Sequence, residues 1–458
     1  MTRPTCREAA PAADGRTGVD EPRRWRVLFD CPAAHAMFDD RSAAGIGGAE
    51  FRAATFARGL AAVGPWDVHF VLASREPRDS ERREGVLVHY EAGPGHARTW
   101  LGTLGRAMTR LVGSLEQRCL GWPARRSSFP GGESDVVAAF GVSNRTASVV
   151  RTARARGQAV VLFITSDRTL EDVLRRGRRD RGLYGEFGAL CRYSLRNAHA
   201  IIAQTEYQSA ELRRVAGVHS VVIRNPIESC ATDEATRPGE TRGAYVLWVG
   251  RSDNNSKRAD LALEVARRCP KQRFVLIMNR HDERLFDEYC RDCPGNVTIV
   301  PHVPWRRMDH YYRHADWLMN TSDREGLPNA FLQSGLHGVP VVSLNADPDG
   351  LLARQGGGVC AGGAVDRLVE TLQRISVQSH EYQRMSRRIR EQVLLAHGAE
   401  ARCRELSSVL LQSLAASSSG PASTRPGVPD RGFPGRDTWP VVAREVQESL
   451  PWKPCDAA

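Results

Sequence analysis

The sequence predicts two α/β domains, each with a parallel sheet covered by helices, and three observations support this fold class. The chain has 458 residues, more than a single hydrophobic core normally accommodates, so two domains of roughly 200 residues each are expected. Short apolar strand patterns alternate with helical patterns along most of the chain, as in parallel sheets. A polar, turn-rich stretch at residues 227–242 interrupts this alternation and predicts an interdomain linker.

The first domain is expected over residues 24–226, behind a polar segment at 1–23 whose composition predicts disorder. Its opening strand, at residues 25–30, is followed by a glycine loop at 45–50 and by apolar residues at helical spacing over 51–62. A glycine loop between a strand and a helix can bring backbone N–H groups close to a phosphate. Further strands are predicted at residues 68–73, 86–90, 136–140, 159–164 and 200–203.

The second domain is expected over residues 243–414 and opens with an apolar strand at 244–250. Further strands are predicted at 273–277, 297–300 and 339–343, and residues 365–414 have helical patterns. The segment 415–458 is rich in Ala, Ser, Gly and Pro and predicts a flexible tail. Two similar sheets joined by a linker imply a cleft between the domains.

Composition argues against a membrane-spanning or secreted protein. No run of 18 or more apolar residues is present, and the first 25 residues lack the apolar core of a signal peptide, so a cytoplasmic location is expected. The net charge is +11 and comes mainly from arginine, because Lys257, Lys271 and Lys453 are the only lysines. This surplus fits an anionic donor, an acidic membrane surface or no specific partner, and no motif supports nucleic-acid binding.

The cysteines give little sign of a metal or redox site. Eleven are scattered without regular spacing, and the only close pair is Cys290 and Cys293. A single C-x-x-C without a second pair or a histidine partner is weak evidence for zinc or redox chemistry. We therefore expect no metal and no cofactor.

The segment at residues 318–344 carries the most functional information. An apolar strand end runs into a loop that contains Glu325 and Gly326, and Pro328 stands at the start of a helix. Gly338 closes that helix before a second apolar strand. Parallel sheets bind ligands at the carboxyl ends of their strands, and a helix N-terminus offers free N–H groups to an anion. The loop is therefore predicted to meet a phosphate and a hydroxylated group together.

A second candidate loop follows the strand that ends at Gly250. It contains Arg251 and Lys257 and precedes a helix predicted to start near Asp260. Two cations at the carboxyl end of a strand can hold a diphosphate and neutralise the charge that grows on it as it leaves. A solvated turn is the plain alternative, but the scarcity of lysine elsewhere favours a functional role.

These two loops resemble the donor domain of family 4 glycosyltransferases, GT-B enzymes that move a sugar from a nucleotide-sugar donor. The resemblance covers about residues 25–412 and implies two Rossmann-like domains whose parallel sheets face each other across a cleft. Glu325 matches the first acid of the family's E-x7-E signature. The resemblance implies that Glu325 contacts the hydroxyls of the donor sugar. It also implies that Arg251 and Lys257 stabilise the departing diphosphate. The other donor-binding residues implied are Gly47 and Gly48 of the glycine loop, the backbone N–H groups of Gly326, Leu327 and Asn329, and Gln333.

The sequence departs from the family pattern at two places. Gln333 replaces the second acid, and an amide keeps a hydrogen bond to ribose but loses its charge-assisted strength. The family's histidine after a strand of the first domain is also missing, so either Thr165, Ser166 or Asp167 occupies that space or a histidine comes from elsewhere in the chain. No acceptor-side base is therefore assigned.

The expected function is a retaining glycosyltransferase that moves a sugar to a glycan or glycolipid acceptor in polysaccharide or cell-surface glycan biosynthesis. Peripheral contact with the inner face of a membrane stays open. A sugar-nucleotide epimerase on the same scaffold and a catalytically silent sugar-nucleotide binding subunit are the alternatives. A glycosidase that uses Glu325 and residue 333 is disfavoured, because eight helical residues span about 12 Å, beyond the roughly 5 to 9.5 Å between hydrolase carboxyl groups.

Three further patterns have more than one interpretation. The apolar stripe over residues 100–119 favours core packing over membrane docking. The arginine run at 175–181 fits lipid phosphates, an anionic acceptor or a solvated helix face. Residues 347–350 lie near the expected nucleotide site but are predicted to form a plain turn.

Overall fold

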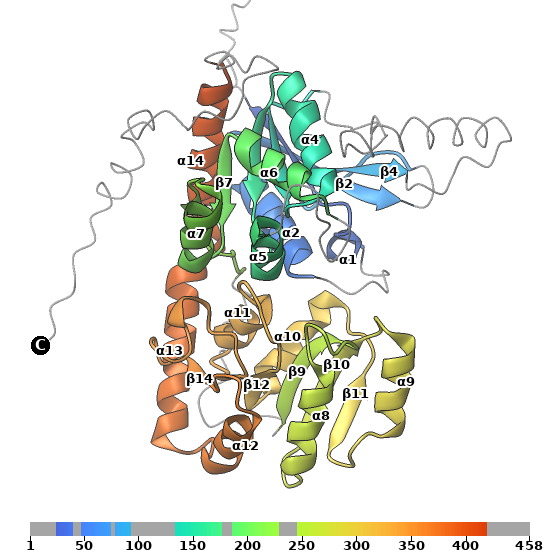
Figure 1. Ribbon diagram of the computed structural model, residues 1–458, viewed down its shortest axis with the longest axis vertical. Helices are drawn as coiled ribbons and strands as arrows, with labels where there is room; N and C mark the ends of the chain where they lie inside the picture. The colour runs from blue at the N-terminus through green and yellow to red at the C-terminus, as the bar shows by residue number, and fades with distance from the viewer. Residues whose placement is uncertain are drawn as a thin grey trace, which may run out of the picture. The chain divides into compact units, whose positions relative to one another are not determined.

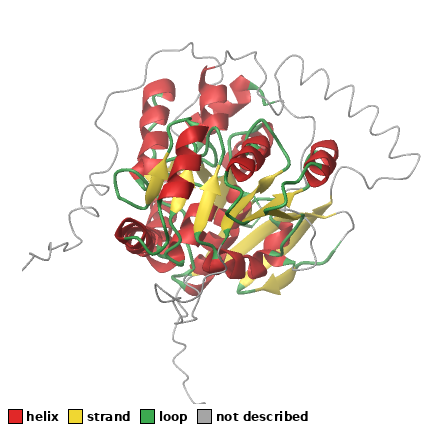
Figure 2. Cartoon of the chain, turned by 90° about the horizontal axis from the view of Figure 1, so that it is seen from below, coloured by secondary structure: helices red, strands yellow, loops and turns green. Residues whose placement is uncertain are grey.

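The computed structural model describes residues 24–39, 47–74, 78–92, 133–175, 186–228 and 245–418. Within this part the chain forms two sheets, one from the blue to green elements and one from the yellow to orange elements of Figure 1. Helices lie on both faces of the strands (Figure 2), so the predicted α/β architecture is confirmed. Several predicted segments lie outside the described residues, namely 1–23, the apolar stripe at 100–119, most of the arginine run, most of the linker at 227–242, and 419–458.

The first sheet has eight strands in the order β3-β4-β2-β1-β5-β6-β7-β8. All neighbours are parallel except β3 and β4 at one edge. The strands are β1 (Trp25–Asp30), β2 (Trp66–Ser74), β3 (Glu81–Arg83), β4 (Val86–Ala92), β5 (Val136–Phe140), β6 (Ala159–Phe163), β7 (Ala200–Ala203) and β8 (Val221–Val222). The strands predicted from apolar runs are all present, and the inner strands β6 and β7 are buried on both faces, as is typical of a parallel sheet.

The helices of the first domain connect these strands. They are α1 (His35–Phe38), α2 (Gly48–Ala62), α4 (Asn144–Ala155), α5 (Asp167–Arg175), α6 (Gly188–Asn197) and α7 (Glu206–Glu211), which continues into a π-helical turn at Leu212–Ala216. The apolar face predicted for residues 51–62 is buried, with Phe51, Phe56 and Leu60 in the core. Helix α2 begins directly after Gly47, so the glycine loop leads into a helix N-terminus as expected.

The second sheet has six parallel strands in the order β11-β10-β9-β12-β13-β14. The strands are β9 (Val246–Arg251), β10 (Phe274–Asn279), β11 (Val297–Val300), β12 (Trp317–Asn320), β13 (Val341–Ser343) and β14 (Gly358–Cys360). The helices are α8 (Ala259–Arg268), α9 (Glu283–Arg291), α10 (Trp305–His314), α11 (Asn329–Leu336), α12 (Val365–Arg374) and α13 (His380–His397), with a 3₁₀ turn at Pro348–Gly350.

The last helix, α14 (Ala399–Ser418), differs from the expected domain boundary at residue 414. Its apolar face packs into the core of the first domain, where Cys403, Leu406 and Leu410 are fully buried beside Phe56 of α2. Residues 399–414 therefore belong with the first sheet rather than the second domain. The helix also runs to Ser418, four residues into the expected flexible tail, and Ser418 Oγ donates to the carbonyl oxygen of Leu414 at 3.0 Å.

The chain crosses between the domains at two adjacent places. Ile227 donates its N–H to the carbonyl oxygen of His397 at 2.8 Å, and Ala399 donates to the carbonyl oxygen of Ile227 at 3.1 Å. His397 Nδ1 also lies 2.8 Å from the carbonyl oxygen of Asn225, and burial lowers the pKa of His397 to about 4. The imidazole is therefore neutral near pH 7, and the two crossings form one hydrogen-bonded hinge.

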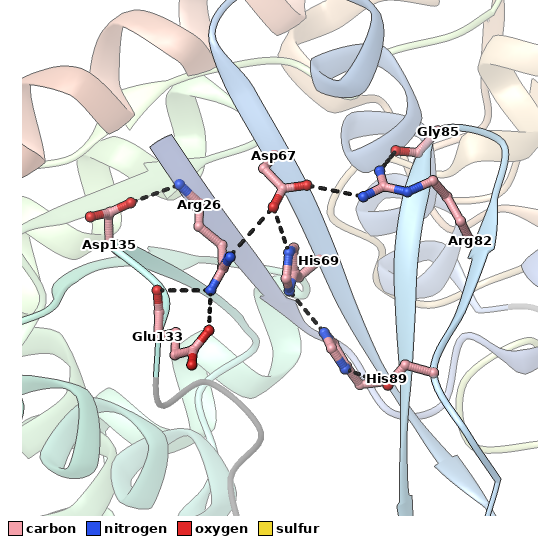
Figure 3. Close-up of polar contacts among 9 residues, drawn as sticks. Arg26, Asp67, His69, Arg82, Gly85, His89, Glu133 and Asp135 are labelled. Carbon is pink, nitrogen blue, oxygen red and sulfur yellow. Dashed lines mark hydrogen bonds and ion pairs between the residues drawn. The ribbon is translucent and has the colours of Figure 1, made fainter. Parts of the chain in front are cut away.

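A polar network lies near the amino ends of β1 and β2 in the first sheet (Figure 3). Asp67 accepts from His69 Nε2 at 2.9 Å and pairs with Arg26 and Arg82. His89 Nε2 lies 2.8 Å from His69 Nδ1. Burial is the main cause that lowers the pKa of both histidines. The network links neighbouring strands near their amino ends. Ligands of such sheets bind at the other end of the sheet, at the carboxyl ends of the strands.

Candidate active site

Two loops meet at the carboxyl ends of β9 and β12, which are neighbours in the second sheet. Lys257 follows β9 and Glu325 follows β12, and the Lys257 ammonium pairs with Glu325 Oε1. Ser322 Oγ donates to the same oxygen at 2.7 Å. Glu325 Oε2 has no hydrogen-bond partner within the described part of the chain. The structure thus brings together two of the three residues predicted to be catalytic and leaves one carboxylate oxygen available.

Asp253 organises the loop that holds the two predicted cations. Its Oδ1 accepts from the backbone N–H groups of Ser256 at 2.7 Å and Lys257 at 2.9 Å. Its Oδ2 pairs with Arg251 Nε. Burial opposes ionisation of Asp253, but the hydrogen bonds from Arg251 and from the loop outweigh it and lower its pKa. A single ionised carboxylate therefore ties Arg251 to the turn that presents Lys257.

Trp248 supports the same loop by packing against Gly250 and through a hydrogen bond to Thr321. A Cβ on Gly250 would lie 2.4 Å from the Trp248 ring, so only glycine leaves room for the indole on this strand. The indole Nε1–H donates to Thr321 Oγ1 at 2.9 Å. Thr321 Oγ1 in turn lies 2.8 Å from the carbonyl oxygen of Lys257 and 2.9 Å from that of Arg258. The brace fixes the backbone of Lys257 relative to the end of β12.

Arg258 has a left-handed backbone conformation, with φ of 52° and ψ of 57°. This region costs a non-glycine residue roughly 1–2 kcal/mol and persists where the surroundings impose it. Ion pairs with Asp260 and Asp323 hold the Arg258 side chain. The conformation reverses the chain directly after Lys257 and starts α8 at Ala259.

The helix start after Glu325 reaches into the first domain. Pro328 occupies the position before α11, as predicted, and Asn329 begins the helix. Asn329 Nδ2 donates to the carbonyl oxygen of Gly48 at 2.9 Å, while its Oδ1 accepts from Asn225 Nδ2 at 2.8 Å. The side chain of Asn329 therefore connects the glycine loop, the hinge and α11. Sequence reasoning assigned only its backbone N–H to the site.

Gly326 also lies against the first domain. A Cβ at this position would come within 2.9 Å of Gln208 Nε2 and 3.3 Å of Asp167 Oδ1. The first contact is closer than Cβ atoms normally tolerate, so a larger residue would push the two domains or these side chains apart. Glycine at 326 allows the Glu325 loop to approach the carboxyl end of β6.

Asp167 is the first residue of α5 and stands where the family resemblance expects a histidine. Of Thr165, Ser166 and Asp167, only Asp167 lies on the wall of the cavity beside Glu325. Burial raises the pKa of Asp167 to about 6, against a hydrogen bond from Gln208 that lowers it. Nearby negative charges, including that of Glu325, raise it further. The carboxyl group therefore titrates just below neutral pH.

A cavity of about 490 Å³ lies between Asp167 and the Glu325 loop. Among the described residues, Arg324 is the only basic residue on its wall. Carboxylates dominate the wall: Asp167, Glu171, Asp323, Glu325, Asp347 and Asp349. Neither Arg251, Lys257 nor Gln333 is among the lining residues. Gln333 is half-buried one turn into α11, so its predicted contact with ribose stays a prediction.

The predicted turn at residues 347–350 also contacts the first domain. It forms a 3₁₀ turn in which Asp349 has a φ of 50°. The Asp349 carboxylate accepts from the backbone N–H of Glu206 at 3.1 Å and pairs with Arg224 at 3.3 Å. Arg324 makes a similar contact, because its guanidinium lies 2.6 Å from Glu171 of α5. Both contacts join the second domain to the wall of the cavity in the first.

The described residues give no sign of a metal site or of a transmembrane segment. No group of three or more His, Cys, Asp or Glu side chains among them is arranged to hold a metal ion. Cys290 and Cys293 are free thiols. None of the helices within the described ranges is long and apolar enough to cross a membrane.

Sequence reasoning missed the residues that support the site. Thr321 and Ser322 directly precede the Glu325 loop, and Asp253 lies between the two predicted cations, so a closer look at small polar residues beside the motif could have found them. Gln208 and Asn225 had no such signal. Each reaches the site from a distant part of the chain: Gln208 is 41 positions from Asp167 in the sequence, and Asn225 is 104 positions from Asn329.

Part of the second domain matches a known protein family. Residues 243–377 match the family model described as glycosyl transferases group 1, and this range includes Arg251, Lys257, Glu325 and Gln333. No curated protein matches the sequence at a significant level.

Solved structures resemble most of the chain. Sucrose-phosphate synthase from Thermosynechococcus elongatus is 16% identical, with a TM-score of 0.63 over 86% of this chain and 100% of that chain. WaaG, a glycosyltransferase involved in lipopolysaccharide biosynthesis, is 13% identical, with a TM-score of 0.56 over 84% and 99%. Anabaena HepE, solved in complex with UDP-glucose, is 12% identical, with a TM-score of 0.55 over 84% and 99%. The chain therefore has the predicted GT-B fold of two Rossmann-like domains, and its second domain matches the group 1 glycosyl transferase model.

Proposed function

We propose that this protein is a retaining glycosyltransferase of the family 4 type, which transfers a sugar from a nucleoside-diphosphate sugar to a hydroxylated glycan or glycolipid acceptor. The observation that carries the proposal is the pairing of Lys257 with Glu325 at the carboxyl ends of two neighbouring strands. Both residues lie within the range that matches the glycosyl transferase model. A group that binds diphosphate and a group that binds sugar hydroxyls are thus held next to each other.

Lys257 can bind the diphosphate while it keeps its ion pair with Glu325. An ammonium has three N–H donors, and Glu325 Oε1 occupies one of them. The remaining donors are free to bind phosphate oxygens, and Arg251 adds a guanidinium on the same loop. As the bond between the anomeric carbon and the diphosphate oxygen breaks, negative charge builds up on the leaving group, and preorganised cations stabilise it.

Glu325 supplies the contact to the donor sugar. Its Oε1 is fixed by Lys257 and Ser322, so the orientation of the carboxylate is set before any substrate arrives. Its Oε2 is then positioned to accept hydrogen bonds from sugar hydroxyls. The start of α11, with Asn329 at its first position, adds backbone N–H groups and a partial positive charge for an anion.

Related structures suggest the first substrates to test. HepE was solved with UDP-glucose, and WaaG acts in lipopolysaccharide biosynthesis. UDP-hexoses are therefore the first donors to screen, followed by GDP- and ADP-hexoses, with neutral sugars and alkyl glycosides as acceptors. We propose that the protein acts in polysaccharide or glycolipid assembly.

The experiment measures release of nucleoside diphosphate from each donor with and without an acceptor, with product analysis for the new glycoside. Acceptor-dependent release is expected, and the anomeric configuration of the product tests retention. Conversion of the donor sugar without any acceptor would instead identify an epimerase. Calorimetric binding of a donor with no release across the acceptor panel would identify a silent binding subunit, the second candidate, which Gln333 in place of an acid favours.

A further inference from the structure

Asp167 is held in one orientation by Gln208, whose own amide is fixed by the backbone of Gln204. Gln208 Nε2 donates to Asp167 Oδ1 at 2.6 Å, and the Gln208 side chain is completely buried. Gln208 Oε1 accepts from the backbone N–H of Gln204 at 2.8 Å, and Gln204 Nε2 donates to the carbonyl oxygen of Ile164 at 2.9 Å. This chain of hydrogen bonds fixes the amide of Gln208, so Asp167 Oδ1 is occupied and Oδ2 is directed elsewhere.

The other carboxylates on the cavity wall already have strong partners. Glu171 pairs with Arg324, and Asp349 pairs with Arg224. The remaining three are also engaged: Asp323 pairs with Arg258, Glu325 pairs with Lys257, and Asp347 accepts backbone N–H groups of Leu352 and Ala353. Asp167 differs, because among the described residues it binds neither a cation nor a backbone N–H group.

The position of Asp167 matches an acceptor contact better than a donor contact. It lies on the first domain, across the cavity of about 490 Å³ from Glu325, which reaches the site from the second domain. Its Oδ1 is near enough to Gly326 that a Cβ there would lie 3.3 Å away. A substrate that enters this cavity therefore meets Asp167 on one side and the sugar held by Glu325 on the other.

We propose that Asp167 binds the acceptor, with Oδ2 accepting a hydrogen bond from an acceptor hydroxyl, and that the part of the acceptor in this cavity is an uncharged hydroxylated group. The inference rests on the proposed glycosyltransferase function and deepens it. The charge of the wall supports the substrate class. Four of the six carboxylates on the wall are neutralised by ion pairs with arginine or lysine. Asp167 and Asp347 have no cation partner among the described residues, so a phosphate or carboxylate on the acceptor would meet like charges in a partly desolvated space.

The test compares the wild-type protein with Asp167→Asn, which keeps an oxygen for Gln208 but removes the charge. Acceptor KM for neutral glycosides should rise by about 10- to 100-fold, as expected for loss of a charge-assisted hydrogen bond. Donor KM and donor hydrolysis without acceptor should change little. Because burial raises the pKa of Asp167 to about 6, wild-type kcat/KM for the acceptor should fall below about pH 6, and the variant should lose this dependence.

A matched control is Asp172→Asn, which removes the same charge from the same helix at a residue that does not line the cavity. Its acceptor KM and pH profile should equal those of the wild type. The inference is overturned if Asp167→Asn leaves both unchanged, or if it lowers donor hydrolysis as much as transfer, because the latter indicates a structural role. It is also overturned if phosphorylated glycosides are better acceptors than their neutral forms.

Failure of the proposed function would look different. In that case the wild-type protein would release no nucleoside diphosphate from any donor. Calorimetric titration of neutral alkyl glycosides into the complex with UDP would still decide the role of Asp167. Weaker binding by Asp167→Asn than by the wild type and Asp172→Asn supports the inference, and equal binding by all three overturns it.

Discussion

The two walls of the candidate site are built in different ways. On the second domain, Asp253, Thr321 and Ser322 hold the loops of Lys257 and Glu325 through several short hydrogen bonds within one sheet. On the first domain, Asp167 is supported by Gln208 alone, and the wall is completed by contacts that come from the other domain. Under the proposed function, these are a donor half that is preorganised by itself and an acceptor half that is complete only when the domains meet.

The largest effect is expected from Lys257→Ala, which removes the cation of the preorganised half. Loss of one charged group that stabilises a leaving anion typically lowers kcat by about 100- to 1,000-fold. The measurement is the turnover number with saturating donor and acceptor. Lys271→Ala is the matched control, because Lys271 is exposed and lies at the far end of the sheet, before β10. A normal turnover number for Lys257→Ala would contradict the assigned role.

Gly326→Ala tests the acceptor half, because it separates the walls without removing any functional group. The added Cβ would lie 2.9 Å from Gln208 Nε2, so the domains cannot approach as closely. We expect kcat/KM for transfer to fall by about 10- to 100-fold, since small misplacement of reacting groups is costly, while the melting temperature stays near that of the wild type. Gly295→Ala controls for the substitution, since a Cβ there has open space. Equal activity of both variants would show that close approach at Gly326 is not needed.

Thr321→Val tests whether the donor half is braced as described. The change leaves the buried Trp248 Nε1–H without its acceptor and frees the carbonyl oxygens of Lys257 and Arg258. An unsatisfied buried donor costs about 1–3 kcal/mol, so chemical denaturation should show a loss of that order. Calorimetry should also show weaker donor binding. Thr298→Val on the exposed face of β11 should show neither change.

The smallest effect is expected from Gln333→Glu. If residue 333 faces the donor ribose, a carboxylate restores a charge-assisted hydrogen bond and should tighten donor binding by about threefold to tenfold. Isothermal titration with UDP provides the measurement. Unchanged affinity would place Gln333 outside the donor site and confine that site to the loops of Lys257 and Glu325.

The same contrast explains what could be predicted from the sequence. Most strands depend on local patterns, so apolar runs were sufficient to predict them, although the short strands β3, β8 and β14 were not predicted. The donor loops were proposed from glycines and from the spacing around Glu325. The acceptor wall depends on contacts between residues far apart in the chain, such as the hydrogen bond between Asn329 and Gly48, which are 281 residues apart. No local sequence pattern predicts such a contact. The return of α14 to the first sheet has no local signal either.

The return of α14 has a consequence for biosynthesis. Domains usually fold in the order in which the ribosome makes them, but here Leu406, Leu410 and Leu414 complete the core of the first domain. The second domain has its own apolar cores, one of which ends with Ile389 and Val393 of α13. The part of the protein that is synthesised first is therefore the last to be finished, and a nascent chain that stops before residue 399 holds a completed donor half beside an acceptor half with an open core.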